Sequence, residues 1–264
     1  MRGEQRIFVE AVRRYCARHA ITVELRSGGW LIVMHKGGRR HFALGYDIGL
    51  NSAIAHRIAS DKAATADILA LAGIPAVAHT LFSNPARAGL APQAAAQAAM
   101  RDLLRQHEQG LVIKPNTGSS GQLVFRARDA TGLARATEAI FTASLDVAIA
   151  PFVTIEEEVR VVLLDGQPLV VYSKQRGADW HHNLGAGATA LLLDRGEMRE
   201  ACAAIAARAT SAIGIRFASV DVIRVEGRWL VLEINSGVMM EALGRQHRKV
   251  VEEAYAAALD AVFA

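Results

Sequence analysis

The chain has 264 residues, of which 52% are hydrophobic and 21% charged, with a formal net charge of +4. This is the composition of a globular protein, and no apolar run is long enough to predict a membrane span. The charge is spread along the chain and aromatics make up only 6%, which disfavours nucleic acid as the main partner. Two distant cysteines indicate neither a disulfide framework nor a zinc site, and the charged N-terminus is no secretory signal, so we expect a cytoplasmic protein.

Taken in chain order, the predicted elements mix helices and strands without a regular βαβ alternation. Helices are predicted over 5–19, 51–72, 91–110, 131–145, 196–213 and 241–262. Strands are predicted over 21–34, 39–46, 76–82, 111–115, 123–127 and 147–152, and hairpins over 156–176 and 219–235. Residues 176–189 read as an irregular segment. This pattern favours an α+β or mixed α/β fold over a doubly wound sheet.

The hairpin SVDVIRVEGRWLVLEIN carries three oxygen-bearing side chains in otherwise apolar strands. Glu233 and Asn235 are two residues apart and share a face, and a turn at 226–227 brings Asp221 to the same face. The hairpin contains no basic residue on that face, so a buried arrangement needs a cation, and hard oxygen ligands suit Mg²⁺ or Mn²⁺. An exposed face of solvated acids is the alternative.

A second candidate site is the loop NTGSSG between two predicted strands. Its glycines, hydroxyls and backbone N–H groups can surround phosphate oxygens, and Lys114 precedes it as a point charge. It is not a P-loop, because no GxxxxGK[ST] leads into a helix. The alternative is a plain hairpin tip with a surface lysine.

Four motifs in order resemble the ATP-grasp superfamily over about residues 50–240. They are Asp61-Lys62 before the helix that ends at AGIP, VIKPNTGSSGQ, APFV with EEEVRVVLLDG, and SVDVI with VLEINS. The pattern is most similar to carboxylate–amine ligases of the cyanophycin synthetase, glutathione synthetase and RimK-like groups. It implies an α+β fold in which two subdomains grip ATP, with a short N-terminal α/β region. The corresponding divisions are 1–60, 61–150 and 151–264.

The resemblance also implies how the nucleotide binds. Two lysines hold phosphates, the glycine-rich loop covers them, a hinge strand faces the adenine and an acid binds the ribose. In the hinge, the backbone donor should be Val153, since Pro151 has no N–H. The implied nucleotide-binding residues are Lys62, Lys114, Ser119, Ser120, Gly121, Pro151, Phe152, Val153 and Glu158.

By the same resemblance, Asp221, Glu233 and Asn235 hold two Mg²⁺ ions, with Mn²⁺ as the alternative, against the nucleotide phosphates. A carboxylic acid and an amine would be the small, amino-acid-like substrates, joined through an acyl phosphate. The implied catalytic residues are Arg160, Lys174, Arg176 and Asn183. Two other functions stay open: a small-molecule kinase on the same scaffold and a nucleotide-binding protein without catalysis.

The chain departs from these relatives in three places. The region before Asp61 is short for a substrate-binding domain, which allows a homodimer to supply missing walls. The segment SGVMMEAL follows Asn235 where many relatives have a turn with proline and glycine. Position 219 is serine where some relatives have an arginine near the acyl phosphate, and Arg216 and Arg245 are the candidate replacements. The acid and amine therefore stay unidentified.

Overall fold

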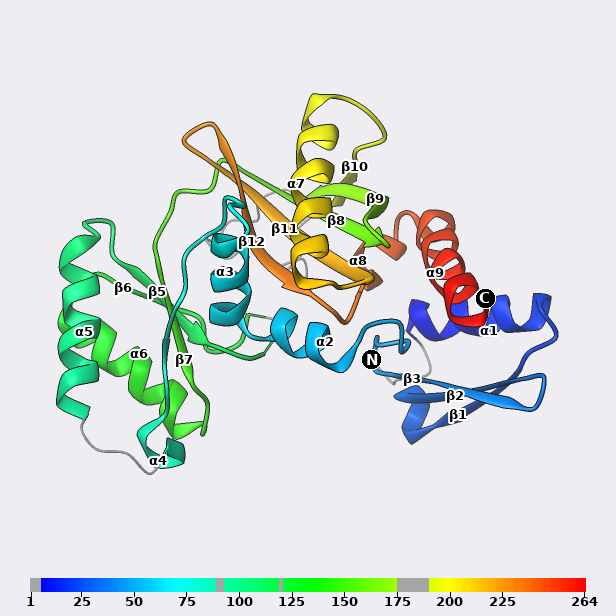
Figure 1. The fold of residues 1–264 in the computed structure, drawn as a ribbon, viewed down its shortest axis with the longest axis horizontal. Coiled ribbons are helices and arrows are strands. Elements are labelled where there is room, and N and C mark those ends of the chain that lie inside the picture. The colour runs from blue at the N-terminus through cyan, green and yellow to red at the C-terminus, as the bar shows by residue number, and fades with distance from the viewer. Residues whose placement is uncertain (1–5, 89–92, 119–120, 175–189) are drawn as a thin grey trace.

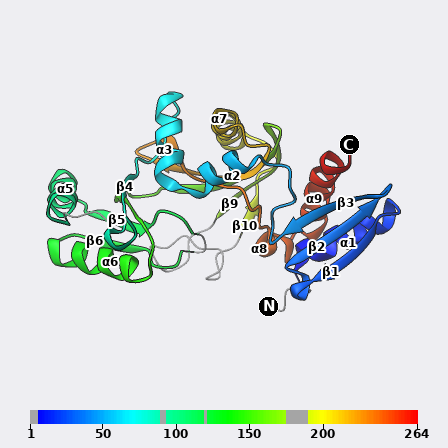
Figure 2. The same cartoon turned by 60° about the horizontal axis from the view of Figure 1, so that its bottom comes forward.

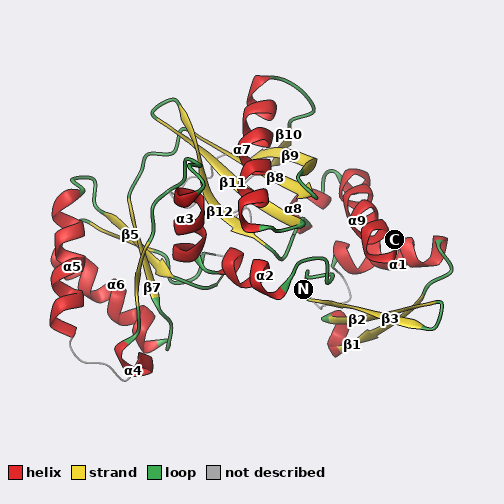
Figure 3. Ribbon diagram, in the orientation of Figure 1, coloured by secondary structure: helices red, strands yellow, loops and turns green. Residues whose placement is uncertain are grey.

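A computed structural model of the chain describes residues 6–88, 93–118, 121–174 and 190–264. The fold is mixed α+β, as predicted, and its three sheets are antiparallel (Figure 1, Figure 3). In the part of the chain that is described, no helix combines the length and apolar character needed to cross a bilayer.

The first sheet forms an N-terminal unit together with helices from both ends of the chain. Its elements are α1 (Ile7–Arg18), β1 (Thr22–Arg26), β2 (Leu31–Lys36) and β3 (Arg39–Leu44), joined by α8 (Glu241–Gly244) and α9 (Arg248–Phe263). Apolar residues of α1, α9 and the inner sheet face share one core, in which the rings of Phe8 and Tyr255 meet edge to face at 5.0 Å. The C-terminal helix is thereby fixed against the N-terminal one.

The second, central sheet has the strand order β10-β9-β8-β11-β12. Its strands are β8 (Glu157–Leu164), β9 (Gln167–Lys174), β10 (Ala190–Leu192), β11 (Phe217–Val225) and β12 (Arg228–Asn235). Both predicted hairpins are present, and their turns at Asp165-Gly166 and Glu226-Gly227 have positive φ at both residues, as a type I′ turn requires. Helices α2 (Ala53–Ser60), α3 (Lys62–Leu71) and α7 (Glu197–Ile213) cover one face (Figure 2).

The other face of the central sheet, called the site face below, is apolar at both ends and charged in the middle. One end carries Ile223, Leu230 and Leu232, and the opposite end carries Val162, Tyr172 and Phe217, which pack on the N-terminal unit. The charged middle consists of Glu158, Arg160, Lys174, Asp221, Glu233 and Asn235. Strand alternation places these side chains on the same face, with a β-bulge at Leu232 that brings both Leu232 and Glu233 to it.

The third sheet has the order β4-β7-β5-β6 and one helical layer. It consists of β4 (Thr80–Phe82), β5 (Leu111–Pro115), β6 (Phe125–Ala127) and β7 (Val147–Pro151), with α4 (Pro85–Ala88), α5 (Gln93–Gln106) and α6 (Ala130–Thr142). Two connections join it to the central sheet. Residues 75–77 pair with Val231 of β12, and the Glu156 amide donates to Arg224 O at 2.8 Å.

The structure corrects several predicted element boundaries. The helix predicted over 51–72 is two helices, because Asp61 is extended and its side chain caps α3 through the Ala64 amide at 2.8 Å. The helix predicted over 241–262 is likewise divided into α8 and α9. The strand predicted over 76–82 is only β4, since the chain before it pairs with β12 instead. Helix α4 and strand β10 were not predicted, and the whole of the segment 176–189 lies outside the described residues.

Candidate functional site

The register of β11 and β12 places the three predicted oxygen ligands together. Asp221 lies opposite Glu233, and Asn235 lies opposite Ser219 one pair further along the same face. The Asn235 amide donates to Glu233 Oε1 at 3.3 Å, which leaves the amide oxygen as an acceptor. The register shifts after Asp221, so Leu232 is an extra residue that bends β12 next to the site.

Two cations from neighbouring strands contact Asp221. Arg160 is its register partner on β8 and donates from Nε and Nη2 at 2.7 and 2.6 Å, while Lys174 Nζ on β9 is 3.0 Å away. The sequence argument that this face lacks a basic residue was wrong, because it considered the hairpin alone. Burial of Asp221 opposes its ionisation, but Arg160 and Lys174 outweigh this and hold its pKa well below the usual range.

Lys174 also pairs with Glu158, so one buried network runs across β8, β9 and β11. Lys174 contacts both Glu158 and Asp221, and all three side chains are at most 5% exposed. Burial raises the pKa of Glu158, and the charge of Lys174 opposes that rise. In this structure Glu158, the predicted ribose ligand, is 4% exposed and engaged with Lys174.

Tyr172 is a site residue that the sequence reasoning missed. It is buried on β9, opposite Arg160 and two residues from Lys174, and hydrogen bonds with the Arg160 guanidinium. The sequence does contain a signal for it, because Tyr172 and Lys174 are two residues apart on one strand and therefore share a face. Its meaning depended on knowing that β9 lies next to β8.

The two predicted phosphate lysines approach Glu233 from outside the central sheet. Lys62 begins α3, and its Nζ donates to Gly118 O at 3.1 Å, at the start of the glycine-rich loop. Lys114 on β5 is 8% exposed, and burial lowers its pKa to about 8 despite the opposing field of Glu233. Both lysines interact electrostatically with Glu233, so the structure brings these predicted residues together.

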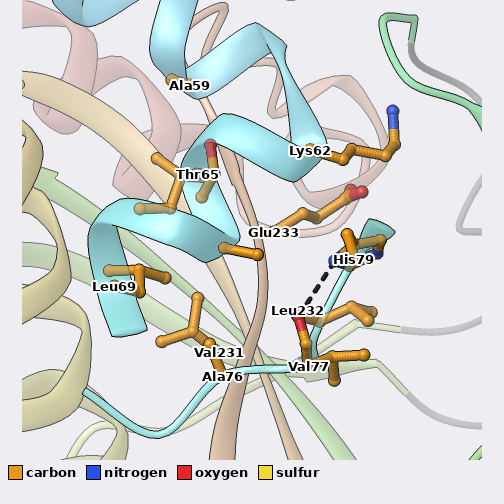
Figure 4. Close-up of a pocket in the computed structure, with 12 residues that line it drawn as sticks. Ala59, Lys62, Thr65, Leu69, Ala76, Val77, His79, Val231, Leu232 and Glu233 are labelled. Atoms are coloured by element: carbon orange, nitrogen blue, oxygen red, sulfur yellow. Dashed lines mark hydrogen bonds between the residues drawn. The ribbon is translucent and has the colours of Figure 1, made fainter. Parts of the chain in front are cut away.

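His79, just before β4, lies beside Glu233 and Lys62, and the sequence did not predict it as a site residue. Figure 4 shows its ring beside Glu233 and Lys62 in a small pocket against β12. Its Nδ1 is 2.9 Å from Val77 O, which can only accept, so Nδ1 carries the proton and Nε2 is an acceptor. Burial, with the charge of Lys114, lowers the pKa of His79 to about 3, so the ring is neutral. Among described residues, Nε2 has no hydrogen-bond partner.

The predicted hinge packs in an apolar cluster at one end of the site face. Ala150 packs with Val77 and Ile223, and the partly buried Val153 and Leu232 adjoin them. The Phe152 amide donates to Gly110 O at 2.9 Å, so the adjacent Val153 amide is the one that matches the predicted backbone donor. The Arg126 guanidinium stacks on the Phe152 ring.

The remaining predicted residues are either outside the described chain or away from the site. Ser119, Ser120, Arg176 and Asn183 lie outside the described residues, whereas Gly121 is described with φ 69°. Arg216 is half exposed and paired with Asp165 at 2.7 and 2.9 Å, so it does not replace the arginine missing at position 219.

The side chains of the site face supply only some of the ligands that a hard divalent cation needs. Glu233 and Asn235 supply a carboxylate and an amide oxygen, which Mg²⁺ and Mn²⁺ accept. Within the described ranges no group of three or more His, Cys, Asp or Glu side chains could hold a metal. Such a site therefore fits a cation that takes further oxygen ligands from a bound phosphate.

Comparisons with known proteins identify the family to which the chain belongs. A family model described as the RimK-like ATP-grasp domain matches residues 59–257. The chain is 27% identical over 204 residues to a "Probable alpha-L-glutamate ligase" of Haemophilus ducreyi, covering 74% of this chain and 60% of that protein. The chain therefore spans less than two thirds of this relative's length.

Solved structures that share the fold include a ligase and a synthetase. A D-alanine–D-alanine ligase from Bacillus anthracis complexed with ATP has a TM-score of 0.60 at 20% identity, covering 80% of this chain and 69% of that one. The D-cycloserine synthetase DcsG has a TM-score of 0.59 at 24% identity, covering 77% and 71%.

Proposed function

The chain belongs to the family of RimK-like ATP-grasp domains, and on this premise we propose that it is an ATP-dependent carboxylate–amine ligase. The observation that carries the proposal is the meeting of Lys62 and Lys114 at Glu233, next to Asp221 and beside the apolar cluster at the hinge. Lysines suited to phosphates, oxygens suited to a divalent cation and an apolar cluster suited to a flat base together match the parts of a nucleoside triphosphate.

In this proposal the base lies between the hinge and the apolar end of the site face. The Val153 amide and hinge carbonyls would bind the adenine edge, and Glu158 would bind the ribose once Lys174 turns away from it. Lys62, Lys114 and the loop residues Ser119, Ser120 and Gly121 would hold the phosphates. Asp221, Glu233 and Asn235 would hold Mg²⁺ or Mn²⁺, which neutralises charge on the transferring phosphoryl group when bound.

The reaction would proceed in two balanced steps. A substrate carboxylate oxygen attacks the γ-phosphorus as the bond to ADP breaks, giving an acyl phosphate. An amine then attacks the acyl carbon, loses a proton and displaces phosphate, leaving an amide. Arg160 and Lys174 would bind the anionic oxygens, and Arg176 and Asn183 would complete the set by resemblance. Because no side chain forms a covalent bond, positioning and electrostatics supply the acceleration.

The division into 1–60, 61–150 and 151–264 is retained as a proposal about the working parts. It follows the three sheets, although α2 and α3 pack on the central sheet and α9 packs on the N-terminal unit. Closure of the part around β5 and β7 over the site face would bring Lys114 and the hinge onto the nucleotide.

A screen for ADP release tests the function. Wild-type protein with Mg²⁺ and ATP should release ADP only when an acid and an amine are both present, and the first acid and amine pools should include L-glutamate and dipeptides. The variant Glu233→Gln should lose turnover and keep its circular dichroism spectrum. A stable phosphorylated product without free phosphate would instead identify a kinase, and ATP binding without turnover would identify a non-catalytic protein.

A further inference from the structure

Asp221 has two competing sets of partners. In the structure Arg160 donates to both carboxylate oxygens, at 2.7 and 2.6 Å, and Lys174 lies 3.0 Å from Oδ1. The proposed function assigns the same oxygens to a divalent cation. A guanidinium and a divalent cation repel each other strongly at such distances, so both cannot hold the carboxylate in this geometry.

We propose that Asp221 is an exchangeable counter-ion, which holds Arg160 and Lys174 until metal-bound nucleotide enters and then transfers them to the phosphate oxygens. Before nucleotide binds, Asp221 thus keeps Arg160 and Lys174 charged and holds them next to the proposed position of the phosphate oxygens. This inference rests on the proposed function and concerns the order in which the site is assembled.

The burial of the network explains why the exchange must be concerted. Glu158, Asp221 and Lys174 are 2–5% exposed and Arg160 is 14% exposed, and the two acids balance the two cations. Removing one partner from a buried ion pair leaves an uncompensated charge, which is costly. If Asp221 turned to a metal alone, Arg160 and Lys174 would lose a counter-ion, and only an incoming phosphate or carboxylate restores the balance.

Glu233 differs from Asp221 in this respect. Its described hydrogen bond is with the Asn235 amide at 3.3 Å, and Lys62 and Lys114 act on it only through electrostatic interaction. Glu233 and Asn235 are therefore ready to accept a cation, whereas Asp221 must first release Arg160. Metal and nucleotide should then strengthen each other's binding, as two ligands coupled through one network.

Binding of Mn²⁺ without nucleotide, followed by the paramagnetic resonance signal of free Mn²⁺, tests the exchange. Arg160→Met removes the competing guanidinium, and we expect the affinity for Mn²⁺ alone to rise about ten- to a hundredfold, the range of charge-assisted hydrogen bonds. Lys62→Met is the control: it also removes one positive charge, but from beside Glu233, where the side chain does not contact Asp221. Its gain in affinity for Mn²⁺ alone should be clearly smaller.

A double-variant cycle separates exchange from general electrostatics. In an Asp221→Asn background, Arg160→Met should give no gain in Mn²⁺ affinity. A gain that persists in that background, or equal gains from Arg160→Met and Lys62→Met, would overturn the proposal. Circular dichroism checks that each variant is folded. If Asp221→Asn does not fold, the comparison of Arg160→Met with Lys62→Met decides alone.

Failure of the proposed function gives a different result. Wild-type protein should bind Mn²⁺ much more tightly with ATP than without it. Absence of Mn²⁺ binding even with ATP would reject the nucleotide site itself. Tight binding with ATP, but no effect of Arg160→Met on binding of the metal alone, would reject only the exchange.

Discussion

Glu241 caps helix α1 by accepting the backbone N–H of Ile7 at 2.8 Å, from 234 residues further along the chain. The same carboxylate accepts from the Phe8 amide at 3.2 Å and from the Tyr46 hydroxyl at 3.1 Å. The residue at the N-cap of α1, Arg6, makes no side-chain cap of its own. The segment after Asn235 thus holds the N-terminal unit through Glu241.

Glu241→Ala should destabilise the protein by about 2–4 kcal/mol, because it leaves buried N–H groups of α1 unpaired and removes the cap. Urea unfolding followed by circular dichroism measures this. Glu253→Ala on α9 is the control, since that carboxylate is 65% exposed and its ion pair with Lys249 spans 3.9 Å. Similar losses from both substitutions would contradict the role given to Glu241.

Gly110→Ala should disturb both stability and the hinge. A Cβ at Gly110 would lie 2.3 Å from Ala127 O at a φ of +89°, and Gly110 O is the acceptor for Phe152. Gly166→Ala is the matched control for Gly110→Ala, because Gly166 also has a positive φ, +77°, but has nothing within 4 Å of the added Cβ. We expect about 1–2 kcal/mol of destabilisation from Gly166→Ala and clearly more from Gly110→Ala.

Nucleotide affinity separates the two glycine variants further. Since Gly110 fixes Phe152, Gly110→Ala should weaken ATP binding in calorimetry, whereas Gly166→Ala, in the turn between β8 and β9, should leave it unchanged. An equal effect of both on ATP affinity would show that the Gly110–Phe152 contact does not shape the hinge.

The hairpin could be predicted from the sequence because its signals are local. Period-two alternation and a two-residue turn predict that β11 pairs with β12. Continued from that turn, the register would pair Asp221 with Leu232, and only the bulge at Leu232 shifts it so that Asp221 lies opposite Glu233. The cations of Asp221 could not be found this way. Arg160 reaches it only because β8 lies next to β11 in the sheet order, which is a non-local property.

His79 illustrates a different limit. A single histidine in the segment AVAHT carries no periodic or turn signal, and its position depends on two connections. Residues 75–77 pair with β12, and β4 pairs with β7, so the residue between them is held next to Glu233. The resemblance to ATP-grasp enzymes supplied the lysines and the acids, because those are carried by motifs, and did not supply this residue.

Burial of His79 as a neutral ring should make the protein less stable in acid. Its folded pKa is about 3 against an ordinary value of 6.5, so between these values the unfolded chain binds a proton that the folded one does not. Stability from this group is present above pH 6.5 and is lost as pH falls, by about 1.4 kcal/mol per pH unit. His79→Phe should flatten the fall in unfolding free energy between pH 6 and 4, and identical slopes would contradict this.

Nucleotide binding should weaken above pH 8 because of Lys114. Its folded pKa is about 8 against an ordinary 10.5, so the ammonium loses its proton as pH rises through 8. At pH 9 about a tenth of the protein would retain the charge, and ATP affinity should fall about tenfold if binding requires it. Bound phosphate favours the charged form, so binding should take up a proton between pH 8 and 10.5, measurable by calorimetry in buffers of different ionisation enthalpy.

Two variants of Lys114 isolate its contribution to the pH profile. Lys114→Arg keeps the charge across this range, so its ATP affinity should stay level from pH 7 to 9.5. Lys114→Met has no proton to lose, so it should bind ATP weakly at pH 7 and no more weakly at pH 9. The fall in ATP affinity of the wild type at high pH is caused by Lys114 only if neither variant shows that fall. A decline of the same size in Lys114→Met would assign the pH dependence to another group.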